Sequence, residues 1–370
     1  MKKLLFALFL CCSITFYGQN PSLVSLSQND FLEEKSSVET SSKPADKKET
    51  FFDFVSKKEI FEFTLTADFD TLIENKRKIV DFLPGKVSFL NDENELDTLK
   101  VTLRPRGKFR RKVCDFPPLR LKFKKKGLRK MGLKDNYNSF KIVTHCLESK
   151  KDSKKNILRE YLIYKIYNLH TDHSFRAQLI KITYVQKGSN KKLFKRYGIL
   201  LEGDKELAKR SNADVVEKFA VTPDSLTTFS GSLHSVFQCM IGNSDWSMSG
   251  MRNVKLLRLE NEKQLTILPY DFDCSGFVEA SYAIPNPDYK LTSTRQRVFL
   301  GKIYSEEEMI QITNHFLDKK DATLTTIKNF SLLHRKCRKQ TIKYLKSFYE
   351  MMEDEKKFIE ELHKLSPKKP

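Results

Sequence analysis

The chain has 370 residues, of which 39% are hydrophobic, with 28 Phe and 13 Tyr, and its formal net charge is +20. This apolar content can fill one large or two modest cores, which excludes a wholly disordered chain. The seven cysteines include no CxxC pair, which argues against a zinc site and against a disulfide scaffold.

Residues 1–19 have the order of a secretory signal peptide. Lys2 and its basic neighbour precede an apolar run over residues 4–12, and Gly18 and Gln19 close the segment. We expect cleavage near these two residues, and therefore an exported protein that is periplasmic, at the cell surface or secreted.

A lipoprotein anchor at Cys11 or Cys12 is the less favoured alternative, because Leu10 stands where a small residue normally precedes the acylated cysteine. No later segment reaches about 18 consecutive apolar residues, so we expect no transmembrane segment in the mature chain. In an exported protein one disulfide can form among the remaining cysteines, although we expect most of them to be buried thiols.

Residues 20–50 are rich in Ser, Glu, Lys and Asp and show no sustained periodicity, which predicts a disordered linker with structure beginning near Phe51. From residue 60 to residue 123 apolar residues alternate with polar ones, with turn residues between the runs. This alternation predicts an antiparallel sheet with strands at 60–65, 85–90, 99–103 and 119–123 and a short helix at 68–78.

A largely apolar segment at 156–169 predicts a buried helix, and strands are expected at 179–185 and 197–201. The remainder has a mainly helical pattern. Helices are predicted at 226–241, 305–317 and 322–363, with a strand pair at 254–257 and 265–268.

This order predicts an α+β protein with two lobes and a cleft between them. Residues 51–204 would form an antiparallel-sheet N-lobe with one buried helix, and residues 205–366 a mainly helical C-lobe. The acidic residues of a candidate site fall in the second of these segments.

Four polar residues of the second half have a pattern that suits phosphoryl transfer. Asp245 is followed eight residues later by Asn253, and the second predicted strand of the pair ends at Asp271 and Asp273. On an extended segment the last two carboxylates point to one face, about 7 Å apart, which suits a divalent ion bridged to phosphate. A carboxylate such as Asp245 could orient an acceptor hydroxyl and take its proton. Solvated turn acids and helix caps are the structural alternative.

A strongly basic stretch runs from Arg104 to Lys134, with fourteen Lys or Arg and one acid, Asp115. It is either a solvated surface, a phosphate cradle or a surface for an acidic partner. Nucleic acid is the least favoured ligand, because no zinc finger, helix-turn-helix or RNA-binding aromatic signature accompanies the charge.

These motifs together resemble the spore-coat CotH kinase family. The basic segments 104–112 and 117–123 are similar to its Arg-Gly and Lys-Phe region, and Asp245-Trp246, Asn253 and the segment 269–273 are similar to its later loop and Asp-x-Asp segment. The resemblance covers residues 61–276. It implies a divergent exported member with a two-lobed protein-kinase-like fold, which transfers phosphate from ATP to a hydroxyl with Mg²⁺ or Mn²⁺.

The resemblance also assigns roles. Asp245 would be the catalytic acid-base, and Asn253, Asp271 and Asp273 the metal ligands, with the leading acid of the last two left open. The nucleotide would be bound by Arg106, Arg120 and Lys122. Glu160 is the single acid of the predicted buried helix, and it is either the acid of a kinase Lys–Glu pair or a surface-edge glutamate on a core-facing helix. The sequence departs from ordinary kinases in lacking a Gly-rich loop and a His-Arg-Asp motif, and in its longer Asp245–Asn253 spacing.

The predicted function is therefore an exported kinase that acts on a hydroxyl, with a protein as the expected acceptor. The alternative is a catalytically inactive kinase-like surface protein that binds an acidic polymer or a protein partner through its basic face. Scarcity of free ATP outside the cytoplasm is the main argument for this alternative.

Overall fold

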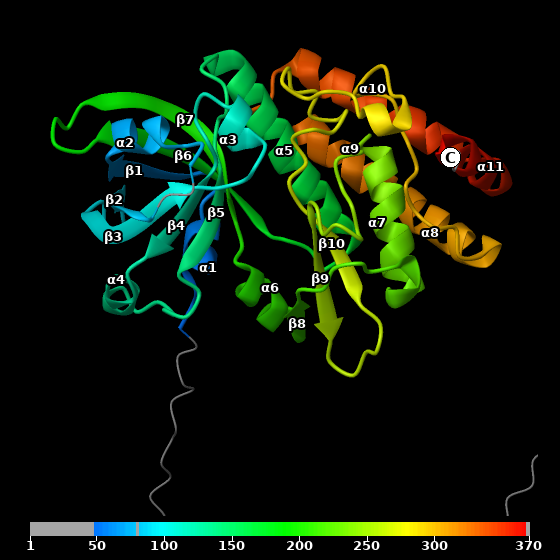
Figure 1. Cartoon of the computed structure of the whole chain (residues 1–370), viewed down its shortest axis with the longest axis horizontal. Coiled ribbons are helices and arrows are strands. Elements are labelled where there is room, and N and C mark those ends of the chain that lie inside the picture. The colour runs from blue at the N-terminus through cyan, green and yellow to red at the C-terminus, as the bar shows by residue number, and fades with distance from the viewer. Residues whose placement is uncertain (1–47, 79–80, 368–370) are drawn as a thin grey trace, which may run out of the picture. The chain divides into compact units, whose positions relative to one another are not determined.

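The computed structural model describes residues 48–78 and 81–367 (Figure 1). The expected signal peptide and most of the expected linker lie outside the described residues. Among the helices that are described, none has the length and apolar character needed to cross a membrane.

Seven strands form a closed barrel in the order β1-β2-β3-β4-β5-β7-β6. They are β1 (Phe61–Ala67), β2 (Leu83–Leu90), β3 (Leu96–Pro105), β4 (Leu119–Phe123), β5 (Ser139–Val143), β6 (Ala177–Gln186) and β7 (Lys192–Leu201). Neighbouring strands are antiparallel except β1 and β6, which pair in parallel with Phe61 opposite Ile180 and close the barrel. Alternating residues of these strands fill its interior with buried side chains such as Leu65, Leu121 and Ile182.

The expected two-lobed protein-kinase-like fold, with an antiparallel-sheet N-lobe, is therefore wrong. The chain has a closed, mixed seven-stranded barrel with helices packed around it. Alternation predicts which segments are strands and pairs neighbours along the chain. It carries no information on the parallel pairing of β1 with β6, which joins segments far apart in the sequence and decides closure.

Four short helices accompany the barrel strands: α1 (Phe51–Ser56), α2 (Phe69–Glu74), α3 (Arg110–Val113) and α4 (Lys125–Lys130). Helix α1 begins with a capping box, in which the Thr50 hydroxyl accepts from the Asp53 N–H and the Asp53 carboxylate accepts from the Thr50 N–H. Its Phe51 ring packs 4.3 Å from the Phe123 ring and 5.6 Å from the Phe140 ring, measured between centroids. This contact joins the start of the described chain to the barrel core.

Helix α5 (Lys150–His170) is the predicted buried helix, and it begins earlier than expected because Ser149 accepts a hydrogen bond from the Asp152 N–H. It runs between the barrel and the later helices and packs on β6, β7 and α9 (Figure 1). Two of its residues, Glu160 and Tyr164, lie one turn apart and reach the candidate site described below.

The rest of the chain builds a second sheet and further helices. The sheet has the order β10-β9-β8 and is antiparallel, with β8 (Ala213–Val216), β9 (Val254–Leu259) and β10 (Thr266–Pro269). The helices are α6 (Asp204–Arg210), α7 (Thr228–Met240), α8 (Glu306–Asp318), α9 (Lys320–Asn329), α10 (Arg335–Met352) and α11 (Glu355–Leu365), with 3-10 turns at Pro223–Ser225 and Pro287–Tyr289.

The predictions at 226–241 and 305–317 are confirmed by α7 and α8. The single helix expected at 322–363 is wrong, because α9, α10 and α11 occupy this region. Asp354 marks one of the breaks, since its side chain accepts from the Lys357 N–H and caps a new helix. The strands β5 and β8 were not predicted, and β5 carries a residue of the candidate site.

One disulfide joins Cys114, at the end of α3, to Cys146, which follows β5. Among the described cysteines, Cys239 is a buried thiol, and Cys274 and Cys337 are partly buried thiols. The bridge ties the basic segment around α3 to the barrel wall.

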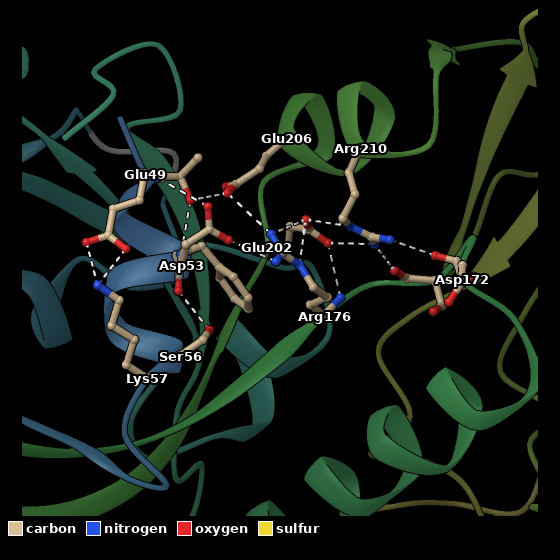
Figure 2. Close-up of polar contacts among 12 residues, drawn as sticks. Glu49, Asp53, Ser56, Lys57, Asp172, Arg176, Glu202, Glu206 and Arg210 are labelled. Atoms are coloured by element: carbon tan, nitrogen blue, oxygen red, sulfur yellow. Dashed lines mark hydrogen bonds and ion pairs between the residues drawn. The ribbon is translucent and has the colours of Figure 1, made fainter. Parts of the chain in front are cut away.

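A charged network holds α1, α6 and the ends of β6 and β7 together (Figure 2). Arg176 lies 2.9 Å from Asp53 and 2.8 Å from the fully buried Glu202, and Arg210 lies 3.0 Å from Glu202. The Thr50 hydroxyl also donates to Glu206. Because α6 begins at Asp204, this network fixes the acid that pairs with a lysine of the candidate site.

Candidate functional site

The loop after α7 carries Asp245 and is closed by Asn253. The side-chain amide of Asn253 donates to the backbone oxygen of Asp245 at 2.6 Å and to its carboxylate at 3.0 Å. Arg252 lies 3.3 Å from the other carboxylate oxygen of Asp245. No helix lies in the described segment between α7, which ends at Met240, and β9, which begins at Val254, so Asp245 is not a helix cap.

The next acids follow β10 directly. The Tyr270 N–H donates to the Asn253 backbone oxygen at 3.1 Å, which places Asp271 beside the Asp245 loop. The Asp271 N–H donates to the Tyr164 hydroxyl of α5 at 3.0 Å. The loop that carries Asn253 and Tyr164 of α5 thus hold the segment of Asp271 in position.

Arg110 of α3 is the centre of the acidic cluster, which we define as Glu160, Asp245, Asp271 and Asp273. Its Nη2 lies 2.5 Å from Asp271, 2.8 Å from Asp273 and 3.3 Å from Glu160. Arg110, Glu160 and Asp273 are each at most 5% exposed. The sequence predicted Glu160 as the acid of a Lys–Glu pair, but its ion-pair partner in the described chain is this arginine.

Burial dominates the proton affinities of the acidic cluster. It raises the pKa of Glu160 to about 8, with Asp273 and Asp271 adding to the rise and Arg110 opposing it. Burial likewise raises the pKa of Asp273 and of Asp245 above the usual aspartate value. The surroundings therefore disfavour this much negative charge, and the cluster attracts cations or protons.

A basic group lies next to these acids, and we define it as Arg106, Arg120 and Lys141. Arg120 of β4 is directly opposite Lys141 of β5, and the positive charge of Arg106 lowers the pKa of both after the larger effect of burial. Lys141 is 8% exposed, and burial lowers its pKa to about 8. Its ammonium lies 2.5 Å from Asp204, which is also 3.6 Å from Lys255.

Tyr270 joins the acidic cluster to the basic group. Its ring centroid lies 4.8 Å from the Lys141 ammonium and 5.8 Å from the Phe175 ring. Burial raises the pKa of Tyr270, with Asp271 adding to the rise and Arg106 opposing it. Tyr270 therefore lies close to both Asp271 and the Lys141 ammonium.

Of the residues predicted to bind phosphate, Arg106 and Arg120 belong to the basic group, whereas Lys122 does not. Lys122 lies two residues further along β4 and is exposed. In a strand this is a shift of about 7 Å along the same face.

Sequence reasoning missed Lys141 and Arg110. A lysine inside the short apolar run Ser139–Val143 was the available signal for Lys141, because a lysine in a buried strand needs a partner. Arg110 had no distinguishing signal, since it stands among other cations of the basic stretch.

The carboxylates of the acidic cluster do not by themselves form a complete set of ligands for a divalent ion. The described residues contain no group of three or more His, Cys, Asp or Glu placed to hold a metal ion. Mg²⁺, however, typically binds one or two carboxylates together with phosphate oxygens, and Asp271 and Asp273 supply such a pair. Four acids face two arginines, Arg110 and Arg252, in this cluster. The donor chemistry and the excess negative charge therefore fit an ion that arrives with a phosphate ligand.

Neither a family model nor a curated protein sequence matches this chain. The resemblance to the CotH kinase family therefore stays a prediction.

Proposed function

We propose that this protein transfers a phosphoryl group from ATP to a hydroxyl group, with a protein as the acceptor. The observation that carries the proposal is the hydrogen bond from Asn253 to the Asp245 carboxylate, in a loop bonded to the backbone beside Asp271. Lys141 of the basic group lies 4.8 Å from the ring centroid of Tyr270, the residue that precedes Asp271. The proposal depends on these side chains and not on a kinase-like fold, because unrelated folds can carry the same chemistry.

The basic group supports binding of the nucleotide phosphates. Arg120 offers a planar fork of donors and Lys141 a compact charge, and both groups are common ligands of phosphate. Asp204 and the Tyr270 ring hold the Lys141 ammonium in one place, so little side-chain entropy would be lost when an anion binds.

Asp245 suits the role of proton acceptor. Burial raises its pKa above the usual aspartate value, while the Arg252 charge opposes the rise. A carboxylate with a raised pKa accepts a hydroxyl proton more readily at neutral pH. The Asn253 amide donates to one carboxylate oxygen, while the other lies 3.3 Å from the exposed Arg252 side chain, which an acceptor hydroxyl would displace. A Mg²⁺ or Mn²⁺ ion held by Asp271, Asp273 and Asn253 would supply positive charge to the phosphate oxygens.

A protein that only binds an acidic partner through its basic face is the second candidate. The guanidinium of Arg110 lies against both Asp271 and Asp273, so an internal cation already neutralises part of the acidic cluster. If the chain is exported, as its first 19 residues predict, free ATP is also expected to be scarce around it.

Thermal unfolding with ATP and Mg²⁺ or Mn²⁺ separates the two functions, because a ligand that binds the folded state raises the melting temperature. We expect stabilisation of the wild type, unchanged stabilisation of Asp245→Asn, and weaker stabilisation of Asp271→Asn. Intact mass after incubation with a protein acceptor should show phosphate transfer by the wild type and none by Asp245→Asn. Asp214→Asn, at an exposed position of β8, is the matched control and should behave as the wild type.

The absence of nucleotide stabilisation in the wild type would leave the binding-only function. Equal transfer by the wild type and Asp245→Asn would remove Asp245 from the chemistry while keeping nucleotide binding.

A further inference from the structure

A cavity lies beside α3 and is lined by none of the residues of the acidic cluster. It has a volume of about 290 Å³ and is lined by Arg77, Lys108, Arg111 and Lys112. All four lining residues are basic, and we call this cavity the α3 pocket. Lys108, Arg111 and Lys112 belong to the basic stretch from Arg104 to Lys134, and Arg77 comes from the segment after α2.

The charge of the α3 pocket has no internal counterion. Within residues 48–78 and 81–367, none of its four side chains forms an ion pair with a carboxylate. The Arg111 Nε is buried and has no hydrogen-bond partner among the same residues. This differs from the basic group of the candidate site, where Asp204 balances Lys141.

The fold holds these cations together against their repulsion. Arg111 donates from Nη1 to the Lys78 backbone oxygen at 2.9 Å, which joins the segment after α2 to α3. Lys76 donates to the backbone oxygens of Cys114 and Asp115 at 2.8 and 3.0 Å. The disulfide of Cys114 fixes the same segment to the barrel wall. Four like charges brought together in this way favour an anion that relieves their repulsion.

Gly107 and α3 separate the α3 pocket from the candidate site. Gly107 has a φ of 78°, a conformation that strains other residues, and it allows the chain to turn between Arg106 and Lys108. Arg106 belongs to the basic group, whereas Lys108 lines the pocket. Arg110 is likewise turned to the acidic cluster, while its neighbour Arg111 lines the pocket. The two sites therefore use different residues of one segment.

We propose that the α3 pocket binds a small polyanion of phosphate chemistry, either a free diphosphate or the phosphate ester of a larger molecule. Two guanidinium forks and two ammonium groups match the many oxygens and the high charge of such a group better than a single carboxylate. The cavity volume of about 290 Å³ has room for one such group. This inference is independent of the proposed kinase function, because none of its residues belongs to the acidic cluster or to the basic group.

Calorimetric titration with inorganic pyrophosphate, at low salt and without divalent ions, tests the proposal. Arg111→Gln/Lys112→Gln should weaken the affinity at least tenfold. Lys125→Gln/Lys126→Gln removes the same charge from exposed positions of α4 and should change the affinity less than twofold. Lys108→Gln changes an exposed lining residue and should also weaken binding. It keeps the test valid if the double variant does not fold.

Failure of the wild type to bind pyrophosphate would overturn the proposal. An equal loss in the α4 control would overturn it as well, since the effect would then come from overall charge. So would unchanged affinity in both pocket variants, which would place the anion at the basic group instead.

A second arm identifies the source of the phosphate. A peptide that contains phosphoserine is compared with its unphosphorylated form on the wild type and on Arg111→Gln/Lys112→Gln. Tighter binding of the phosphorylated form, lost in the variant, supports a phosphate ester as the ligand. Pyrophosphate binding without peptide binding supports a free diphosphate, and equal binding of both peptides by both proteins counts against phosphate recognition in this pocket.

Discussion

Replacing Arg110 by Met should destabilise the protein strongly, because it removes the cation shared by Glu160, Asp271 and Asp273. All three contacts are made by one guanidinium nitrogen that is almost fully buried. Methionine fills a similar volume but leaves the three carboxylates facing each other. Removing one partner of a buried ion pair typically costs about 3–5 kcal/mol of unfolding free energy, and we expect Arg110→Met to fall in this range near pH 8.

The loss of unfolding free energy caused by Arg110→Met should be smaller at low pH than near pH 8. Burial raises the pKa of Glu160 to about 8, from an ordinary value of 4.5, while Arg110 opposes the rise. The folded state therefore binds more protons than the unfolded state between these values, so unfolding free energy falls as the pH rises through this window. Removal of Arg110 takes away the opposing effect, so the fall between pH 5.5 and pH 8 should be steeper in Arg110→Met than in the wild type.

Urea unfolding followed by circular dichroism, at pH 5.5 and at pH 8, measures both effects. Arg129→Met is the matched control, because Arg129 pairs with Asp135 at an exposed position, and we expect little change there. Arg110→Met/Glu160→Gln should recover part of the stability, since one of the uncompensated charges is gone. A loss below about 1 kcal/mol at both pH values would refute the reasoning. So would a double variant no more stable than Arg110→Met.

Three further predictions follow from individual contacts. Burial raises the pKa of Glu206 to about 7, so the wild type should lose at most about 3 kcal/mol of unfolding free energy between about pH 4.5 and pH 7. In urea unfolding, Glu206→Gln should lose less stability over this range. Cys114→Ser should lower the unfolding free energy by about 3–4 kcal/mol, since its bond to Cys146 closes a loop with a sequence separation of 32; equal stability of oxidised and reduced wild type would contradict this. Lys141→Met should weaken ATP binding at least tenfold in a thermal-shift titration, and unchanged binding would place the nucleotide away from the basic group.

Much of the secondary structure was predictable because it depends on short-range patterns. Alternating apolar residues identified most barrel strands, and the helical period identified α7 and α8 within a few residues. The short apolar run of β5 lacked a clear period and was missed. The breaks between α9, α10 and α11 were also missed, because local caps such as Asp354 interrupt a pattern that otherwise continues.

The candidate site was partly predictable for the same reason. Asp271 and Asp273 are close in sequence, and Asp245 and Asn253 belong to one loop, so their spacing already indicated a common site. Arg110 and Lys141 come from a four-residue helix and an unpredicted strand. Only the tertiary structure shows that Arg110 pairs with Asp271 and that Lys141 lies over the neighbouring Tyr270 ring.

By itself, the sequence determined most of the strand and helix segments, the basic stretch and the acidic motifs, because each depends on residues near one another in the chain. The tertiary structure alone decided that the barrel closes, since this depends on the parallel pairing of β1 with β6. The tertiary structure also decided which cations pair with the buried carboxylates. Which cation reaches a buried carboxylate depends on the direction of each side chain after packing, and many nearby arginines and lysines of the basic stretch are equivalent in the sequence.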